Sequence, residues 1–284
     1  MNTTTDQSNL TEELTAGEIT VSGLKIHYNE AGSGTPLVCI HGGGPASSGW
    51  RHFGHLLPEL SAGFRTILID LPGAGQSGDL PDEANTFAWS SELLDKVFDA
   101  LGIDSAHVVG WSFGGRVTLK FAAAFPQRVR KTIVIGTAAE LDGFAPRPST
   151  GAKTVMAVMP PTGRTPENVT AFINAVVHDS SCVPEAEWSE LVSDWQAASA
   201  AERPFNPGVL RDPQLDLYAD LPKVTAPTLF VWGRDDVMGT FQAAALMLQR
   251  MPSAELHVFS KCGHWVQWEK REEFVSVATE FLNR

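Results

Sequence analysis

Short apolar runs alternate with amphipathic segments along most of the chain. Runs of mostly β-branched or apolar residues, with glycine or proline nearby, predict strands at 19–21, 24–30, 37–40, 66–70, 107–110, 132–135, 228–232 and 256–259. The later strands are expected to be fully buried. A helical period predicts helices at 88–101, 114–125 and 272–282, the first two ended by Gly102 and Pro126. The alternation predicts an α/β fold with a mostly parallel central sheet and helices on both faces.

One segment, residues 143–213, interrupts this alternation. It has helical patterns and many prolines but no clear strand, so we expect an inserted helical cap there. Residues 16–142 and 214–284 are then the two parts of one core, and the polar residues 1–15 are expected to be disordered. Trp188 and Trp195 lie seven residues apart on one predicted helix face, where packing into the cap core is favoured over lining a pocket beneath it.

The charge balance narrows the choice of partners. Against 21 Lys and Arg stand 33 Asp and Glu, a formal net charge of −12, which disfavours nucleic acid and anionic membranes. Cys39, Cys182 and Cys262 have no CxxC spacing, so neither a disulfide framework nor a zinc site is expected. The chain shows no apolar targeting stretch and no run long enough to span a bilayer. We expect a cytoplasmic protein that acts on a small molecule, and assembly into a homo-oligomer stays open.

A candidate nucleophile lies between a predicted strand and a predicted helix. Ser112 is flanked by Gly110 and Gly114 in a GxSxG pattern. A sharp strand-to-helix turn can present a serine hydroxyl only if the flanking positions are small. The context therefore favours a nucleophile over a structural serine.

A serine nucleophile requires a base, and His264 is the best candidate among the eight histidines. It follows the last predicted strand, and loops at the carboxyl ends of parallel strands form the site of an open α/β sheet. His41 precedes three glycines and is expected to orient that loop. The other histidines are expected at surface or satisfied core positions: His27, His52, His55, His107, His178 and His257.

The base in turn requires an acid that fixes its tautomer. Asp236 follows the seventh predicted strand, and the chain order of serine, aspartate and histidine agrees with this placement. Asp236 is therefore favoured over Asp235 beside it and over Glu140, which follows the sixth strand. No metal is expected, because no HExxH-like pair or cluster of ligands accompanies these residues.

Backbone N–H groups for an oxyanion hole are expected from Phe113, directly after the serine, and from Gly43 in the glycine-rich loop after the third strand. The same loop lacks the GK[ST] ending of a phosphate-binding loop and the GxGxxG spacing of a dinucleotide fold. No cofactor is expected.

Taken together, these motifs resemble the α/β-hydrolase family, and within it the meta-cleavage-product hydrolases. Those enzymes hydrolyse a carbon–carbon bond in ring-opened aromatic or steroid catabolites without a cofactor. The resemblance is carried by residues 41–45 with 49–50, the turn at 70–77, residues 232–236 and, most specifically, residues 256–269. The interval from Asp236 to His264 also resembles the family's spacing, which implies Asp236 rather than Asp235 as the acid.

Two departures from the subgroup affect substrate choice. Trp111 stands where the subgroup has an asparagine that helps to bind the carbonyl end of its dienoate substrate. The subgroup's cap arginine, which pairs with the substrate carboxylate, has no counterpart, since residues 183–195 contain no Arg or Lys. The nearest cap cations lie elsewhere: Arg147, Lys153, Arg164 and Arg203.

Without both contacts, an ester is favoured over a dienoate, because ketonising a dienoate before cleavage depends on polar groups at its charged end. We therefore expect a carboxylic ester hydrolase acting through an acyl-enzyme on a small aromatic ester or monoester. The expected substrate-binding residues are Gly42, Gly44, Trp111 and Trp265. The alternatives are carbon–carbon hydrolysis of a 2-hydroxy-6-oxo-dienoate, a ligand receptor that keeps the triad without turnover, and an acyltransferase.

Overall fold

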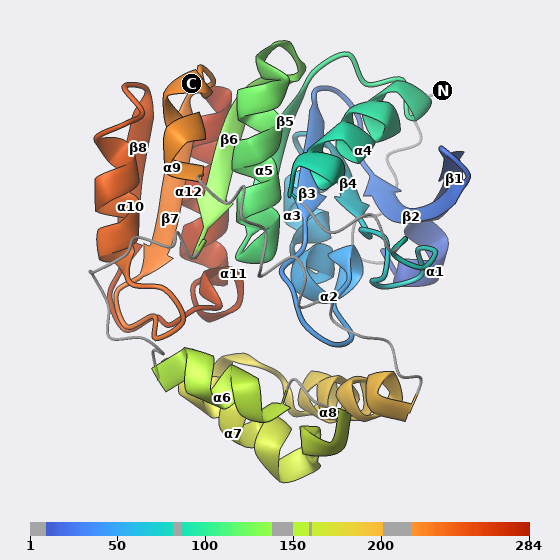
Figure 1. Ribbon diagram of the computed structural model, residues 1–284, viewed down its shortest axis with the longest axis vertical. Helices are drawn as coiled ribbons and strands as arrows, with labels where there is room; N and C mark the ends of the chain where they lie inside the picture. Colours follow the sequence, from blue (N-terminus) through green and yellow to red (C-terminus); the bar gives the residue numbers. More distant parts are fainter. Residues whose placement is uncertain (1–9, 82–86, 138–149, 159–160, 201–216) are drawn as a thin grey trace.

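The computed structural model describes residues 10–81, 87–137, 150–158, 161–200 and 217–284. Its eight strands form one sheet in the order β1-β2-β4-β3-β5-β6-β7-β8 (Figure 1). The strands β1 and β2 pair antiparallel, as do β2 and β4, and every later pairing is parallel. The bounds are β1 Ala16–Val21, β2 Leu24–Ala31, β3 Pro36–Ile40, β4 Arg65–Ile69, β5 Ala106–Trp111, β6 Val129–Ile135, β7 Thr228–Gly233 and β8 Ala254–Phe259. Each predicted strand is present, and the predicted fold class is confirmed.

Alternate residues of the strands face two apolar layers, as the pleat of a strand requires. In β3, Val38 and Ile40 join the core beneath α4 and α5, whereas Leu37 and Cys39 join the core beneath α3 and α12. All four side chains are completely buried. The sheet is therefore covered by helices on both faces, which is why its parallel strands are apolar on both sides.

The three predicted helices are present, each within one residue of its expected ends. They are α4 Phe87–Ala100, α5 Phe113–Ala124 and α12 Arg271–Asn283. In α12, Phe274, Ala278 and Phe281 form one buried face at the spacing that the sequence indicates. The other helices around the sheet are α1 Glu12–Thr15, α2 Gly49–Phe53, α3 Leu57–Ser61, α9 Leu217–Asp220, α10 Phe241–Leu248 and α11 Val266–Glu269. Single 3₁₀ turns lie at Gly54–Leu56, Pro126–Arg128, Pro161–Gly163, Ser180–Cys182 and Leu221–Lys223.

Two expectations about burial and order are corrected. The strands β5 and β7 are buried along their whole length, but β8 is only partly buried. It is the last strand of the sheet and pairs with β7 alone, so its outer edge meets solvent. Within the expected disordered segment 1–15, residues 12–15 form α1, because the Asn29 side chain donates to the Glu12 carbonyl at 2.8 Å and to Thr15 Oγ1 at 3.0 Å.

The described part of segment 143–213 is helical. It contains α6 Thr150–Val158, α7 Pro166–Val176 and α8 Glu185–Ala200, which lie across the carboxyl ends of the parallel strands (Figure 1). The expected limits of the cap at 143 and 213 lie outside the described residues. Trp195 is buried with its ring 5.3 Å from that of Phe172 in α7, and Trp188 is partly buried against the same cluster.

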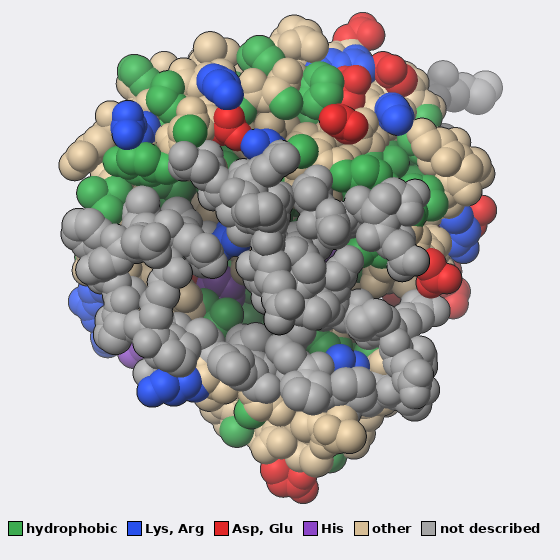
Figure 2. Space-filling view, in the orientation of Figure 1, with side chains coloured by type: hydrophobic (Ala, Val, Ile, Leu, Met, Phe, Trp, Pro, Cys, Tyr) green, Lys and Arg blue, Asp and Glu red, His purple; other side chains and the backbone are tan. Residues whose placement is uncertain are grey.

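Charged side chains of both signs are interspersed over the described surface in the view of Figure 2, rather than gathered into one basic patch. None of the helices in the described ranges is both long and apolar enough to cross a bilayer.

Acid is expected to weaken this fold through His107. Its side chain is buried, and burial together with Arg130 and Lys131 lowers its pKa to about 4. The unfolded chain binds this proton near pH 6.5, so the free energy of unfolding falls as the pH falls from 6.5 to about 4. Between pH 7 and pH 5 the free energy of unfolding of the parent enzyme should therefore decrease, and we expect His107→Gln to make that decrease smaller by up to about 2 kcal/mol. Urea unfolding at pH 7 and at pH 5 measures it. An unchanged pH dependence in the variant would contradict this assignment.

Candidate active site

Ser112 occupies a strained turn between β5 and α5. Its φ is 52° and its ψ is −111°, a conformation that is costly for a residue with a side chain. A Cβ on Gly110 would lie 2.3 Å from the Gly114 carbonyl oxygen, and a Cβ on Gly114 would lie 2.2 Å from the Ile40 carbonyl oxygen. Both flanking positions must therefore be glycine, for the steric reason that the motif predicts.

The turn is fixed by hydrogen bonds to the neighbouring strand. The Ser112 N–H donates to the Ile135 carbonyl at the end of β6, with a length of 2.8 Å. The Thr137 hydroxyl donates to the Ser112 carbonyl at 2.6 Å. These bonds hold the strained backbone in place without engaging the serine hydroxyl, which faces a cavity.

The candidate base and acid form a buried pair. His264 Nδ1 donates to Asp236 Oδ2 at 2.9 Å, and the other carboxylate oxygen accepts the N–H groups of Met238 at 2.7 Å and Gly239 at 3.1 Å. With Nδ1–H committed to the aspartate, Nε2 of the neutral ring is left as the proton acceptor. This is the tautomer that activation of a serine needs.

Asp235, one of the two alternative acids, does not make this contact. Asp235 pairs instead with His178 Nδ1 and with Arg234 Nε, each at 3.3 Å. Glu140 lies outside the residues that the structure describes.

Ser112 and His264 line one cavity of about 190 Å³ at the carboxyl ends of the strands. Of the other predicted site residues, Gly43, Gly44, Trp111, Phe113 and Trp265 also line it. Gly42 does not line it but lines the second cavity described below, and a Cβ on Gly42 would come 2.5 Å from the Trp111 ring. Trp195 also lines the first cavity, the alternative that the sequence disfavoured, and at the same time packs in the apolar cluster of the cap. The other lining residues, which the sequence did not suggest as a pocket wall, include Arg51, His52, Arg116, Phe172, Glu187, Leu191, Met238 and Trp268.

A second cavity of about 540 Å³ adjoins the first. The two share residues 43–47, Arg51 and Phe113, but Ser112 and His264 do not line the larger one. The smaller cavity is therefore the site of any serine chemistry.

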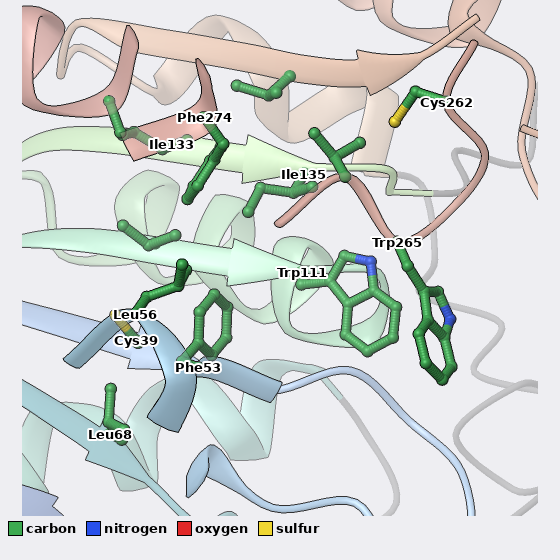
Figure 3. Packing of buried hydrophobic residues seen from close by; sticks show 14 of the residues in the cluster. Cys39, Phe53, Leu56, Leu68, Trp111, Ile133, Ile135, Cys262, Trp265 and Phe274 are labelled. Atoms are coloured by element: carbon green, nitrogen blue, oxygen red, sulfur yellow. The ribbon is translucent and has the colours of Figure 1, made fainter. Parts of the chain in front are cut away.

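Trp111 forms the wall behind the candidate base. Its indole Nε1 donates to the His264 carbonyl at 3.0 Å, and its ring lies 5.3 Å from the His264 ring and 6.1 Å from that of Trp265. Figure 3 places Trp111 and Trp265 next to each other beyond the ends of the strands. The only polar atom of the Trp111 side chain is thus hydrogen-bonded to the loop that carries His264. Trp111 therefore holds the base in place and has no polar group left for a substrate.

His52 is the site residue that the sequence missed. It lies in α2, where it is buried, and the Gly42 N–H donates to its Nδ1 at 3.2 Å. Because Nδ1 accepts a hydrogen bond, the neutral ring must carry its proton on Nε2. Burial, together with His41 and Arg51 nearby, lowers the pKa of His52 well below its ordinary value, so the ring stays neutral.

The Nε2–H of His52 has no hydrogen-bond partner within the described ranges, and it is not a fully enclosed atom. The residue lines the cavity of Ser112 and His264. The expectation of a surface or satisfied core histidine is therefore wrong for His52. No sequence signal pointed to it, because its role arises from the contact with Gly42.

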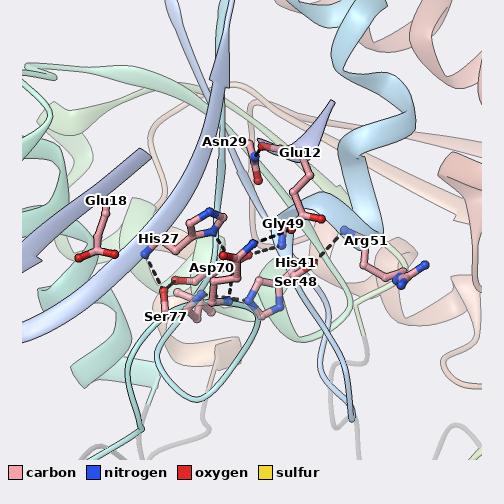
Figure 4. Close-up of polar contacts among 12 residues, drawn as sticks. Glu12, Glu18, His27, Asn29, His41, Ser48, Gly49, Arg51, Asp70 and Ser77 are labelled. Carbon is pink, nitrogen blue, oxygen red and sulfur yellow. Dashed lines mark hydrogen bonds and ion pairs between the residues drawn. The ribbon is translucent and has the colours of Figure 1, made fainter. Parts of the chain in front are cut away.

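A network around Asp70 lies beside the glycine-rich loop, and His41 bonds to that loop directly (Figure 4). The Asp70 carboxylate accepts the N–H groups of Gly49 at 2.7 Å and Gln76 at 2.9 Å, and it pairs with His27. His41 Nδ1 donates to the Gly42 carbonyl at 2.7 Å, while its Nε2 accepts the Leu71 N–H at 3.0 Å. His41 thus orients the loop as its position predicts.

The charged groups at the cavity come from both the core and the cap. Arg51 of α2 pairs with Asp194 of α8 and lies 3.7 Å from Glu190. Burial raises the pKa of Glu187, which also lines the cavity. Among the cap cations named above, Arg164 is buried with its Nε donating to the Val158 carbonyl, and Arg147 and Arg203 lie outside the described residues. Within the described ranges, no cluster of three or more His, Cys, Asp and Glu side chains is arranged to bind a metal ion.

Comparison with known proteins places this geometry in a family. Residues 35–271 match the family described as alpha/beta hydrolase fold. The chain belongs to this family. It is 34% identical, over 92% of its own length and 92% of the relative's, to a 2-hydroxy-6-oxononadienedioate/2-hydroxy-6-oxononatrienedioate hydrolase of Burkholderia vietnamiensis strain G4. It is also 34% identical, over 93% of each chain, to a 2-hydroxy-6-oxo-6-phenylhexa-2,4-dienoate hydrolase of Comamonas testosteroni.

Solved structures agree. A meta-cleavage product hydrolase from Pseudomonas fluorescens IP01 has a TM-score of 0.80 and 27% identity, covering 95% of this chain and 98% of that one. A naproxen esterase from Bacillus subtilis, at 22% identity, has a TM-score of 0.78 and covers 94% of this chain and 90% of that one, which shows a common fold alone. The resemblance to the meta-cleavage-product hydrolases is confirmed, and this α/β-hydrolase is an enzyme.

The contact between Asp236 and His264 predicts which acid the enzyme uses. We expect Asp236→Asn to lower kcat on an activated aryl ester by on the order of 10³- to 10⁴-fold, because an amide no longer fixes the tautomer of the base. Asp235→Asn is the matched control and should change kcat little. The reverse pattern, a silent Asp236→Asn and a damaging Asp235→Asn, would move the acid role to Asp235.

Proposed function

We propose that this α/β-hydrolase hydrolyses a carbon–carbon bond in a ring-opened 2-hydroxy-6-oxo-dienoate. Ser112 is the nucleophile, His264 the base, Asp236 the acid that orients it, and Phe113 and Gly43 supply the oxyanion N–H groups. The observation that carries this proposal is the neutral ring of His52 on the wall of the cavity of Ser112 and His264, where Nδ1 accepts the Gly42 N–H and Nε2–H is left as a donor. It supplies a polar contact of the kind that Trp111 lacks.

The relatives support the carbon–carbon bond over the ester that the sequence favoured. Both curated hydrolases described above are named for dienoate substrates, and each matches the chain over more than nine-tenths of its length. The argument for an ester was that no polar group remained to hold the dienoate. His52 weakens that argument, and the core cation Arg51 on the cavity wall weakens it further.

The chemistry explains why a donor is needed. Ser112 Oγ adds to the ketone carbon as its proton passes to His264, and the N–H groups of Gly43 and Phe113 stabilise the oxyanion. When the carbon–carbon bond breaks, its electron pair passes along the conjugated chain of the ketonised substrate to the 2-oxo oxygen. A neutral N–H donor at that oxygen stabilises the developing charge without a competing proton transfer. His264 then gives its proton to the released dienolate, which leaves as a shorter 2-hydroxy-dienoate. One water, deprotonated by His264, attacks the acyl-serine, and the proton returns to Ser112 Oγ as the carboxylic acid leaves.

Ester hydrolysis is the second candidate, and Trp111 favours it. The indole occupies the position next to the nucleophile with an apolar ring, and its Nε1 is bonded to the His264 carbonyl. An ester needs only the triad and the oxyanion N–H groups, because its alkoxide leaves after protonation by His264. Aromatic walls from Trp111 and Trp265 suit an aromatic acyl group.

We further propose that residues 143–213 form the cap of one core made from residues 16–142 and 214–284. The substrate is then a small molecule that binds between the cap and the core, and the reaction uses no cofactor. Cytoplasmic location and a possible homo-oligomer stay predictions from the sequence.

Kinetics on two substrate classes test the reaction type. We expect kcat/KM for a ring-opened aryl dienoate to exceed that for aryl and monoalkyl esters, with both activities lost in Ser112→Ala because they share the nucleophile. Decay of the yellow dienoate absorbance measures the first activity and release of a chromogenic alcohol the second. An inert dienoate with rapid, serine-dependent ester turnover would favour the esterase, whereas turnover far below about 1 s⁻¹ on every substrate would favour a ligand receptor.

Substitution of His52 tests the proposed donor. His52→Phe should lower kcat/KM for the dienoate by about 10- to 100-fold, the cost of one lost hydrogen bond to a developing charge, and affect esters less. His52→Asn can still accept the Gly42 N–H and donate into the cavity, so it should retain more dienoate activity than His52→Phe. Equal losses on both substrate classes in the two variants would show that His52 only supports the loop.

A further inference from the structure

The loop that carries His264 is held between two other segments. We call residues 260–264 the base loop and residues 234–239 the acid loop. Residues 176–179, which begin with the last residue of α7, are the cap stem. The Asp235 N–H donates to the Cys262 carbonyl at 2.9 Å, and the His264 N–H donates to the Val176 carbonyl at 2.7 Å. The base loop therefore bonds to the acid loop on one side and to the cap stem on the other.

The packing at Gly263 leaves no space for a side chain. A Cβ there would lie 2.4 Å from the Val176 carbonyl oxygen and 2.9 Å from Val177 Cα. The cap stem thus contacts the backbone directly before the catalytic histidine. Because close-packed backbone segments cannot move independently of each other, a shift of the cap stem would also move the backbone at His264.

One carboxylate joins these segments. Glu269 lies at the end of α11, and its Oε1 accepts the Gly263 N–H at 2.7 Å. Its Oε2 accepts the N–H groups of His178 at 2.6 Å and Asp179 at 3.2 Å. One side chain therefore bonds at once to the base loop and to the cap stem.

Both oxygens of Glu269 act as acceptors, so the site requires a carboxylate. The pKa of Glu269 is raised on balance by burial; the backbone N–H donors of Gly263, His178 and Asp179 act in the opposite direction, because they bond to the ionised form. A glutamine has one amide NH₂ group, which would face N–H donors in either orientation. It would lose either the bond to Gly263 or the bonds to the cap stem.

We propose that Glu269 is a positioning residue for catalysis: it locks the base loop to the cap stem and thereby sets the orientation of His264 toward Ser112 and Asp236. This inference rests on the proposed role of His264 as the base, but not on the identity of the substrate. It makes the cap stem a part of the catalytic machinery rather than only a support for the cap.

Glu269→Gln tests this, with Glu272→Gln as the matched control at an exposed position of α12. On an activated aryl ester, we expect Glu269→Gln to lower kcat by about 10- to 100-fold with little change in KM, since a small misplacement of a catalytic group costs this much. The downfield proton NMR signal of the His264 Nδ1–H should shift or broaden in this variant. Glu272→Gln should match the parent enzyme in both measurements.

A folded Glu269→Gln with parental kcat and an unchanged NMR signal would overturn the proposal. If this variant fails to fold, Glu269→Asp replaces it, because a shorter carboxylate can still serve one of the two segments. A smaller loss of kcat with a shifted signal then supports the role, and full activity with a parental signal overturns it. His264→Ala and Ser112→Ala, assayed on the same ester, show separately whether the proposed catalytic roles hold.

Discussion

The strained turn at Ser112 is the constraint around which the rest of the site is built. Its positive φ persists only because the turn is clamped between two strands: Gly114 packs against the Ile40 carbonyl of β3, and the Ser112 N–H bonds to the end of β6. A parallel sheet with helices on both faces provides such a clamp, because it brings the carboxyl ends of several strands to one edge. The loops that carry His41, Asp236 and His264 extend from that same edge.

Local patterns explain why so much of the fold was predictable. Strand and helix positions follow from periodicity and end signals, and the three predicted helices lie within one residue of the observed ones. The exposure of β8 was missed because strand order is set by long-range pairing, which no local run of residues encodes. The order in α1 was missed for the same reason, since it depends on the distant side chain of Asn29.

The residues of the candidate site also fall into two groups, those that a sequence pattern identifies and those that only the folded structure identifies. Ser112, Asp236 and His264 were found because a motif and a chain order mark them, and the Asp236–His264 bond agrees with that prediction. No motif and no chain order points to His52. Its importance depends on which of its nitrogens accepts the Gly42 N–H, and that is known only when the folded backbone is in view. Trp111 places an apolar ring beside Ser112, and His52, whose ring lies 4.5 Å from that of Trp111, is the donor that we propose in its place.

The cap contacts the core in two ways. Backbone hydrogen bonds do not depend on the side chains of the cap, whereas side-chain contacts change when those side chains change. The cap stem is bonded to the base loop through backbone groups and one carboxylate, so its geometry does not depend on which side chains the stem carries. The helix α8 meets the core through side chains instead, such as the pair of Asp194 with Arg51 at the cavity wall. Side-chain contacts can be exchanged without moving the backbone of His264. With His264 as the proposed base and Ser112 as the proposed nucleophile, the cap can vary its substrate-facing wall while the stem keeps the two residues in register, so that one fold carries a constant catalytic apparatus and a variable pocket.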